Sequence, residues 1–332
     1  MGGVKPLRAS VVGVGHLGRH HARILAELEG IELVAVVDSD QERGEKIADS
    51  YGCQWQALIG DLPGSVDFAV IATPTSTHLE SSRPFIEHGC PVLIEKPMAP
   101  DPQTCAEILA LAKSSGAMIG VGHVERFNPA VRRAMELGIK PRFIEAHRLA
   151  PYTFRSTDVG VVLDLMIHDI DLVQAWTGEI PSSIDAVGGK TLSTTEDICS
   201  VRLRFPSGAT ANLTASRLSL KPMRRFRVFG PDSYVSVDSQ DRYALLVQKA
   251  EGFSPQAAAA AAAAGNPADA FKSLLHTEEL QLDEDEPLRA ELEEFAAAVR
   301  EGREHLVSGE AGHSAVVTAF KVLESLEQNC WT

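Results

Sequence analysis

Acidic and histidine side chains on one predicted helix are the first feature of the sequence that could carry chemistry. Residues 161–177 are apolar over most of the helix circumference, yet Asp164, His168 and Asp171 share one face. Buried carboxylates and imidazoles are costly unless they have partners, so this face is an active-site wall, a paired structural network or a metal site. In an active site, Asp164 would orient His168 and raise its basicity, which suits proton transfer.

A second candidate is Lys96, which directly follows the apolar segment 91–95 and precedes Pro97. Another apolar segment, 66–71, leads into Thr73-Pro74. The carboxyl ends of parallel strands are where open α/β sheets bind ligands. We therefore expect Lys96 and Thr73-Pro74 to lie on one rim, although most lysines are simply solvated surface groups.

The positioning elements begin with a glycine-rich turn. Gly13, Gly15 and Gly18 follow an apolar segment and open a helix predicted from about residue 17 to 28. In dinucleotide-binding folds these glycines allow the tight turn, the close approach of the pyrophosphate and the helix packing, and the helix N-terminus binds the phosphates. Asp38 ends the next strand about twenty residues on, where a carboxylate accepts hydrogen bonds from the adenosine ribose. The sequence thus predicts that the protein binds NAD in preference to NADP. Arg43 is the residue that could make this preference weaker.

The order of elements predicts two domains. Apolar strands alternate with helices up to residue 122, which indicates a doubly wound parallel sheet, a Rossmann domain, over residues 1–123. Residues 124–332 show alternating strands, one long helix near their start and two amphipathic helices at the end. We predict an α/β protein whose C-terminal α+β domain has an open, mostly antiparallel sheet and binds substrate and other subunits. The alanine-rich residues 257–264 are expected to form a surface helix or insertion without chemistry.

Composition excludes several classes of protein. The net charge of −14 argues against nucleic acid or an anionic membrane as the main partner. The five cysteines are widely spaced without a CxxC pair, which argues against a disulfide framework or a structural zinc site. The sequence shows neither a signal-peptide core nor an apolar run long enough to span a bilayer. We therefore expect a cytoplasmic protein.

Together these motifs resemble the Gfo/Idh/MocA oxidoreductases, from residue 8 to about 245 and again at Glu286-Pro-Leu and 306–310. The resemblance rests on the glycine turn, Ala72-Thr73-Pro74 with His78, Glu95-Lys96-Pro97, and Gly160 before Asp164-x-x-x-His168. It implies oxidation or reduction of a ring carbon of a sugar, inositol or sugar nucleotide with NAD(P). It also implies that Lys96 hydrogen-bonds the reacting oxygen, that His168 is the general acid/base, that Asp164 positions substrate or histidine, and that the open sheet builds homodimers or homotetramers.

From these observations we assign a set of cofactor residues. They are Gly13, Gly15, His16, Leu17, Gly18, Asp38, Thr73, Pro74, His78, Glu95 and Lys96. His16 and His20 lie one helical turn apart, which could suit a metal ion. However, the start of this helix is the predicted pyrophosphate site, and no third metal ligand is apparent in the sequence. We therefore expect no metal.

The segment Gly122-His-Val-Glu-Arg-Phe-Asn-Pro129 resembles a subgroup that includes UDP-N-acetylglucosamine 3-dehydrogenases. Arg126 could reach the cleft as a fixed cation or form a structural ion pair, and Asn128 could contact substrate or cap the next helix. Lys221, Arg224, Arg225 and Arg227 concentrate positive charge that could hold a diphosphate, or could pair with carboxylates on a sheet surface. The predicted substrate-binding residues are Arg126, Asn128, Tyr152, Arg155, Arg225 and Arg227.

The expected function is an NAD-dependent dehydrogenase acting on a secondary ring hydroxyl of a sugar nucleotide, at C3 of a UDP-N-acetylhexosamine. The alternatives are a free-sugar or inositol dehydrogenase of the same family and a non-catalytic NAD-binding regulatory protein. The regulatory protein would not need Lys96 and His168 together. Metal-dependent isomerase or lyase chemistry on Asp164 and His168 is a further alternative, which sensitivity to chelators would reveal.

Overall fold

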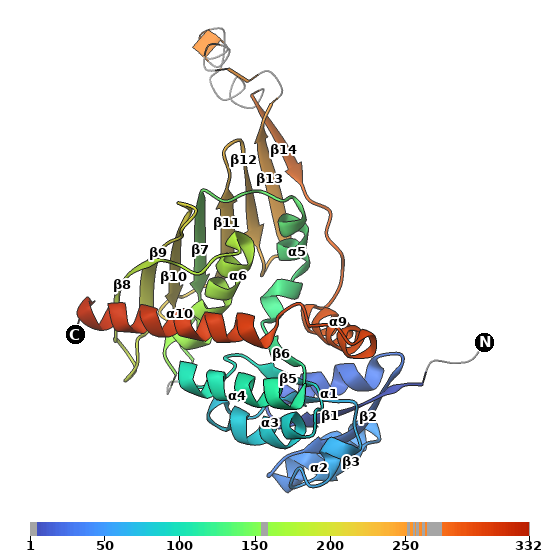
Figure 1. Ribbon diagram of the computed structural model, residues 1–332. Coiled ribbons are helices and arrows are strands. Elements are labelled where there is room, and N and C mark those ends of the chain that lie inside the picture. Colours follow the sequence, from blue (N-terminus) through green and yellow to red (C-terminus); the bar gives the residue numbers. More distant parts are fainter. Residues whose placement is uncertain are drawn as a thin grey trace. The chain divides into compact units, whose positions relative to one another are not determined.

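The computed structural model describes residues 5–153, 159–250, 253–254, 256, 259–260, 263 and 274–331. Most of the alanine-rich residues 257–264 lie outside these ranges. The chain forms two compact units (Figure 1). The first unit comprises Met1–Phe127 and Asp285–Phe320, and the second comprises Asn128–Glu284 and Lys321–Thr332. Whereas the prediction divided the chain once, after residue 123, the first unit also takes up a late segment.

The first unit is built on a parallel sheet of six strands in the order β3-β2-β1-β4-β5-β6. This order is that of a dinucleotide-binding Rossmann fold, which confirms the predicted fold class. Its strands are β1 (Leu7–Val12), β2 (Ile31–Val37), β3 (Gln54–Gln56), β4 (Phe68–Ile71), β5 (Val92–Glu95) and β6 (Ile119–Gly122). Its helices are α1 (Gly18–Glu27), α2 (Gln41–Tyr51), α3 (His78–Glu87), α4 (Pro102–Ser115), α9 (Pro287–Glu301) and the first part of α10 (Gly309–Gln328), with 3-10 turns η1 (Leu62–Gly64), η2 (Thr75–Thr77) and η3 (Val124–Phe127).

Helix α9 joins the first unit because its apolar face completes that unit's core. Leu292 and Phe295 are fully buried in the same cluster as Ile24 and Leu25 of α1 and Phe68 of β4. The rings of Phe68 and Phe295 meet edge to face, with centroids 5.5 Å apart. The late segment therefore belongs to this unit through packing, which the order of elements along the chain does not reveal.

The second unit contains a mixed sheet of nine strands in the order β14-β13-β12-β11-β7-β10-β9-β8-β15. All neighbours pair antiparallel except β7 with β10 and β8 with β15. The strands are β7 (Phe143–Leu149), β8 (Ser183–Gly189), β9 (Ile198–Arg204), β10 (Thr210–Ser216), β11 (Met223–Phe229), β12 (Ser233–Asp238), β13 (Tyr243–Lys249), β14 (Leu275–Glu279) and β15 (Cys330–Trp331). The helices are α5 (Pro129–Glu136), the π-helical η4 (Val162–Met166), α6 (Ile167–Thr177) and the last part of α10.

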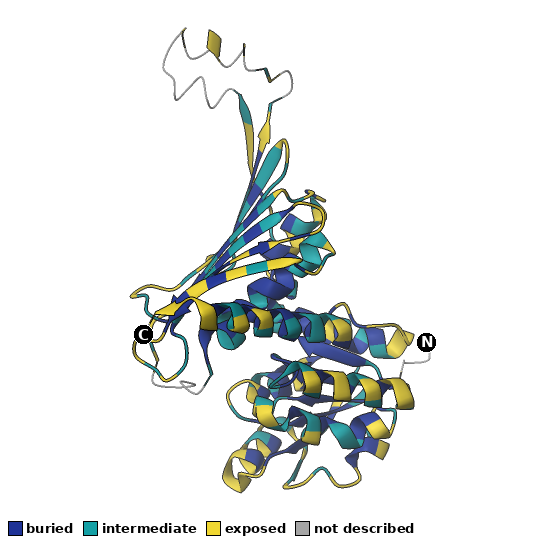
Figure 2. Ribbon diagram, turned by 60° about the vertical axis from the view of Figure 1, so that its left-hand side comes forward, coloured by how far each residue is buried: buried dark blue, intermediate teal, exposed yellow. Residues whose placement is uncertain are grey.

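One face of this sheet is buried and the other is not. Helix α6 contacts β7 and β10, and α5 contacts β12 and β13. Along the central strands, fully buried residues alternate with partly exposed ones, as the colours of Figure 2 show. Phe226 and Val228 point into the core, while Arg225 and Arg227 lie on the open face.

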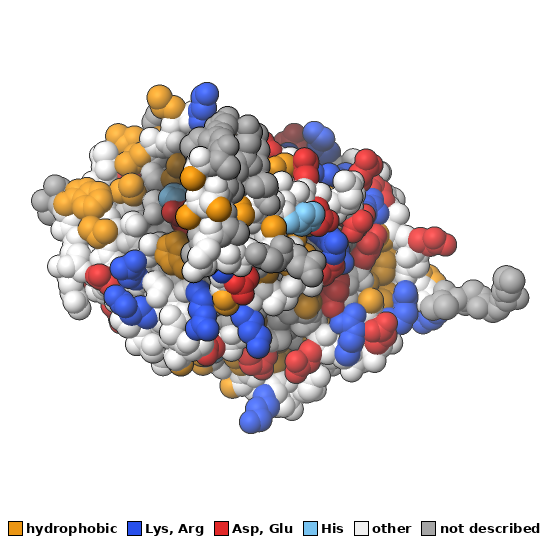
Figure 3. Space-filling model, turned by 90° about the horizontal axis from the view of Figure 1, so that it is seen from above, with side chains coloured by type: hydrophobic (Ala, Val, Ile, Leu, Met, Phe, Trp, Pro, Cys, Tyr) orange, Lys and Arg blue, Asp and Glu red, His pale blue; other side chains and the backbone are white. Residues whose placement is uncertain are grey.

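The surface agrees with the composition. On the face drawn in Figure 3, basic side chains are interspersed with acidic ones rather than forming a continuous basic surface. None of the described helices combines the length and apolarity needed to cross a bilayer.

Acid should weaken the first unit through Glu294 of α9. Burial disfavours its charge, but hydrogen bonds from His305 and Arg303 outweigh burial and lower the pKa of Glu294 from 4.5 to about 2. A carboxylate with a lowered pKa stabilises the fold above its unfolded pKa, and this contribution disappears as the pH falls from about 4.5 toward 2. We expect Glu294→Gln to lower the free energy of unfolding at pH 7 and to lower it less at pH 3, measured by urea denaturation. The exposed neighbour supplies the control, Glu293→Gln. An equal loss at both pH values would contradict the assignment.

Candidate functional site

The glycine turn between β1 and α1 has the geometry of a pyrophosphate site. Gly13 has a φ of +85°, and a Cβ there would lie 2.8 Å from the carbonyl oxygen of Ala72. A Cβ on Gly18 would collide with the carbonyl oxygen of Gly13, whereas one on Gly15 would meet no protein atom within 4 Å. The first and third glycines therefore serve packing, and the space beside Gly15 fits the close approach of a dinucleotide. His16 and Leu17 are exposed at the start of α1.

Asp38 lies at the end of β2, where the ribose site was predicted. It is only 6% exposed, and its carboxylate accepts hydrogen bonds from the backbone N–H groups of Val14 and Asp40, both at 2.9 Å. Arg43 donates two more, from Nε at 3.1 Å and from Nη2 at 2.6 Å. Burial opposes the charge, but Arg43 and these backbone donors outweigh it and lower the pKa of Asp38, so the carboxylate is ionised.

Glu95 and His21 form a buried pair beneath Lys96. His21 Nε2 lies 2.7 Å from Glu95 Oε1, and the Lys96 backbone N–H donates to Glu95 Oε2 at 3.1 Å. Burial disfavours the Glu95 charge, but the His21 hydrogen bond and the nearby Lys96 outweigh it and lower the pKa of Glu95. Both carboxylate oxygens are thus engaged within the protein. These contacts favour an anchoring role for Glu95 over the predicted direct cofactor contact.

Sequence reasoning missed the role of His21. Gly18, His21, Ala22 and Leu25 are all buried, and their spacing marks the inward stripe of α1. A histidine on that stripe needs a buried partner, so the pattern was a usable signal.

His78 holds together the loops that follow β4 and β5. The ring is 1% exposed, with Nε2 3.0 Å from the Thr73 carbonyl oxygen and Nδ1 3.1 Å from that of Pro97. Burial lowers the pKa of His78. These contacts favour a bracing role for His78 over a direct cofactor contact, because both ring nitrogens face backbone carbonyls. Thr73-Pro74 and Lys96 occupy the rim at the carboxyl ends of adjacent strands, as expected.

In the second unit, Asp164 and His168 lie at a change of helix type. The helix predicted over residues 161–177 is confirmed, and it contains a π-helical turn at Val162–Met166, before the α-helical part Ile167–Thr177, which the sequence did not predict. Asp164 and His168 are half-buried, whereas Asp171 is fully buried. π-Helical turns are frequent at functional sites.

Contacts with neighbouring segments hold this part of the helix in place. The backbone N–H of Val161 donates to the Glu196 carbonyl oxygen, and that of Val162 donates to Glu196 Oε1, both at 3.1 Å. A Cβ at Gly160 would collide with the Glu196 carboxylate. Below the turn, Arg148 of β7 and Asp169 form a buried bidentate pair at 2.8 and 3.0 Å. The first helical turn is therefore held by a neighbouring loop and the next turn by the sheet.

The predicted substrate residues are divided between the two units. Arg126 lies in η3 of the first unit, and the others belong to the second unit. Asn128 caps α5 by accepting from the Ala130 N–H at 3.0 Å, and its amide donates to the Ser239 carbonyl oxygen, which favours the capping alternative. Tyr152 lies with its hydroxyl 3.3 Å from Ser193 Oγ, and Arg155 falls outside the described residues.

Two arginines of β11 have carboxylate partners. Arg227 lies 3.2 Å from Glu145 and Arg225 lies 3.6 Å from Asp238. This arrangement favours a paired sheet surface over a diphosphate site.

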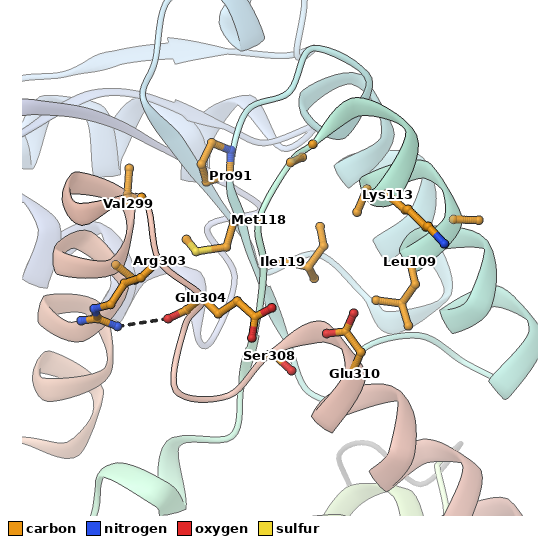
Figure 4. A pocket seen from close by; sticks show the side chains of 16 residues that line it. Pro91, Leu109, Lys113, Met118, Ile119, Val299, Arg303, Glu304, Ser308 and Glu310 are labelled. Atoms are coloured by element: carbon orange, nitrogen blue, oxygen red, sulfur yellow. Dashed lines mark hydrogen bonds between the residues drawn. The ribbon is translucent and has the colours of Figure 1, made fainter.

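The first unit contains a cavity of about 630 Å³ (Figure 4). Its lining includes Pro91 and Met118, which precede β5 and β6, so it opens at the amino ends of strands whose carboxyl ends carry the rim. None of the predicted site residues lines it. Within the described ranges, no cluster of histidine, cysteine and acidic side chains could hold a metal ion.

The buried His21–Glu95 pair predicts a strong coupling between α1 and β5. His21→Leu leaves the Glu95 charge buried without its partner, which should cost about 3–5 kcal/mol in the free energy of unfolding. The double variant His21→Leu/Glu95→Gln should recover part of this loss because the charge is gone. Urea denaturation measures both, with Ile24→Val as a control for a buried α1 residue, expected to cost about 0.5–1.5 kcal/mol. If the loss of unfolding free energy in the double variant equals the sum of the losses in His21→Leu and Glu95→Gln alone, the two residues are not coupled.

Two family models match the chain. A model described as an oxidoreductase family with an NAD-binding Rossmann fold matches residues 7–123, and the GFO/IDH/MocA C-terminal domain matches residues 140–235.

Relatives match over nearly the whole length. UDP-N-acetylglucosamine 3-dehydrogenase from Acidithiobacillus ferrooxidans is 33% identical, with 97% of each chain covered. A solved structure of the enzyme with that name from the same organism has a TM-score of 0.88 at 32% identity and covers 98% of this chain and 99% of its own. Inositol 2-dehydrogenase from Rhizobium meliloti is 26% identical, again with 97% of each chain covered. With the glycine turn, Asp38 and the Rossmann strand order in place, these matches show that the protein belongs to the Gfo/Idh/MocA family of NAD-binding oxidoreductases.

Proposed function

We propose that this NAD-dependent dehydrogenase oxidises a secondary ring hydroxyl of a sugar nucleotide, at C3 of a UDP-N-acetylhexosamine, to a keto sugar. The observation that carries the substrate is the similarity to UDP-N-acetylglucosamine 3-dehydrogenase over 97% of both chains. This match extends over nearly the full length of both chains and so includes loops, which determine specificity.

The catalytic residues in this proposal are Lys96, His168 and Asp164. NAD, when bound, accepts hydride from the carbinol carbon. His168 takes the hydroxyl proton as general base, and Lys96 stabilises the negative charge that develops on the oxygen. Asp164 orients the substrate or His168. The anchoring of the Lys96 backbone by Glu95 supports this role, because a charged group contributes most when its position is fixed in advance.

The cofactor residues in the proposal come from the rim of the first unit. The Gly13–Gly18 turn, with His16 and Leu17, binds the pyrophosphate, and Asp38 binds the adenosine ribose. Thr73 and Pro74 lie on the nicotinamide side.

A second candidate function is oxidation of an unphosphorylated sugar or an inositol. The pairing of Arg225 and Arg227 with carboxylates favours it, because these arginines then have less positive charge to offer a diphosphate. The similarity to inositol 2-dehydrogenase over the full length points the same way.

We further propose a homodimer or homotetramer formed through the open face of the nine-stranded sheet. The partly exposed residues that alternate along β7, β9 and β10 support it, since a broad and partly exposed sheet face must meet water or another subunit. A cytoplasmic location is proposed as well, and the five free cysteines fit a reducing compartment.

The substrate proposal predicts selective stabilisation by nucleotide sugars. In the presence of NADH, UDP-N-acetylglucosamine should raise the melting temperature, since a ligand at about a hundred times its dissociation constant adds about 2.7 kcal/mol of stability. With NAD, the same compound should give NADH and a 3-keto product. Free N-acetylglucosamine and myo-inositol are the comparison ligands. If either compound is turned over as fast as UDP-N-acetylglucosamine, the enzyme does not require the nucleotide, and the second candidate function is supported.

The catalytic proposal predicts that Lys96→Met and His168→Ala each lower kcat by about 100-fold or more while NAD binding persists. Steady-state kinetics with the true substrate and a fluorescence titration with NADH measure the two effects. Lys113→Met and His276→Ala replace exposed residues of the same types and should leave kcat unchanged. Near wild-type kcat in either test variant would exclude that residue from catalysis.

A further inference from the structure

The carboxylate of Asp38 has its hydrogen-bonding capacity filled by the protein itself. Oδ2 accepts from the Val14 N–H and from Arg43 Nε, and Oδ1 accepts from the Asp40 N–H and from Arg43 Nη2. An ionised carboxylate offers about four acceptor positions. A ribose hydroxyl that donates to Asp38 must therefore displace one of these donors.

Arg43 is the donor that can leave. The backbone donors are fixed, because Val14 lies in the glycine turn and Asp40 is the N-cap residue of α2. The Arg43 side chain is instead 46% exposed and reaches Asp38 through a flexible stem. It also has a second carboxylate at hand, since Arg43 Nη1 lies 3.2 Å from Asp40 Oδ2. Its release from Asp38 still leaves the guanidinium paired.

We propose that Arg43 competes with the adenosine ribose of NAD for Asp38 and sets the balance between NAD and NADP. An NAD ribose donates its hydroxyls to the carboxylate and pushes Arg43 aside, which costs affinity. A 2′-phosphate is instead repelled by Asp38, and Arg43 is the cation beside that carboxylate that can bind it through two hydrogen bonds. Arg43 thus weakens NAD binding while it preserves some NADP binding. This inference rests on the proposed ribose-binding role of Asp38 and is independent of the sugar substrate.

The test is the affinity of the full-length protein for NADH and NADPH, measured by the fluorescence of the reduced nicotinamide. Arg43→Met keeps the apolar stem and removes the charge and the donors. We expect its dissociation constant for NADH to fall about two- to fivefold, the range of an exposed ion pair, and that for NADPH to rise about tenfold or more. The gain for NADH should shrink in 1 M KCl, because salt screens the competing ion pair. Arg43→Lys should bind NADPH better than Arg43→Met, since it keeps the charge.

Two further variants separate the explanations. Arg83→Met removes a similarly exposed arginine on α3 and should change neither dissociation constant. Asp38→Ala should weaken NADH binding. If it does not, Asp38 does not bind the ribose, and the proposed competition by Arg43 is overturned as well. If Asp38→Ala weakens NADH binding but Arg43→Met binds NADH no better than the wild type, the competition alone is overturned. Unchanged or improved NADPH binding by Arg43→Met would overturn the role of Arg43 in cofactor choice.

Discussion

One buried negative charge organises the ligand-binding edge of the first unit. Glu95 ends β5 and remains ionised inside the protein because His21 and the Lys96 backbone N–H stabilise it. A buried carboxylate without such partners would be very costly, so helix α1, which carries His21, and the chain after β5 must take up their positions together. The helix that begins the nucleotide site and the lysine proposed for catalysis therefore share one anchor.

The second unit fixes its candidate catalytic helix with different ion pairs. Asp169 and Arg148 join the helix to β7. Asp197 accepts hydrogen bonds from the loop 191–193 and from Arg217, which lower its pKa although burial opposes the charge. This loop leads into Glu196, which holds the first turn of the helix. Asp164 and His168 thus lie on a helix fixed by groups that carry no proposed chemical role, as a preorganised site requires.

Much of the fold follows from local patterns in the sequence. The predicted alternation of strands and helices up to residue 122 and the two predicted helices at the end of the chain are present, because turn residues and hydrophobic periodicity are both local properties. The short strands β3 and β15 escape such reasoning, since they contain only a few residues at sheet edges. The π-helical turn was not predicted either, because the residue pattern around Asp164 fits a regular α-helix.

The sequence by itself determined the cofactor class, through the Gly13–Gly18 turn and Asp38, and it placed Lys96 at a strand end. These features depend on residue type and spacing within one βα unit or at one strand terminus. Only the tertiary structure decided which partners the buried charges take. His21 meets Glu95 across 74 positions of the chain, and α9 completes the core of a sheet that ends at residue 122. A buried charge is stable only when a hydrogen-bond donor lies beside it. Packing between segments that are distant in the chain decides which donor that is.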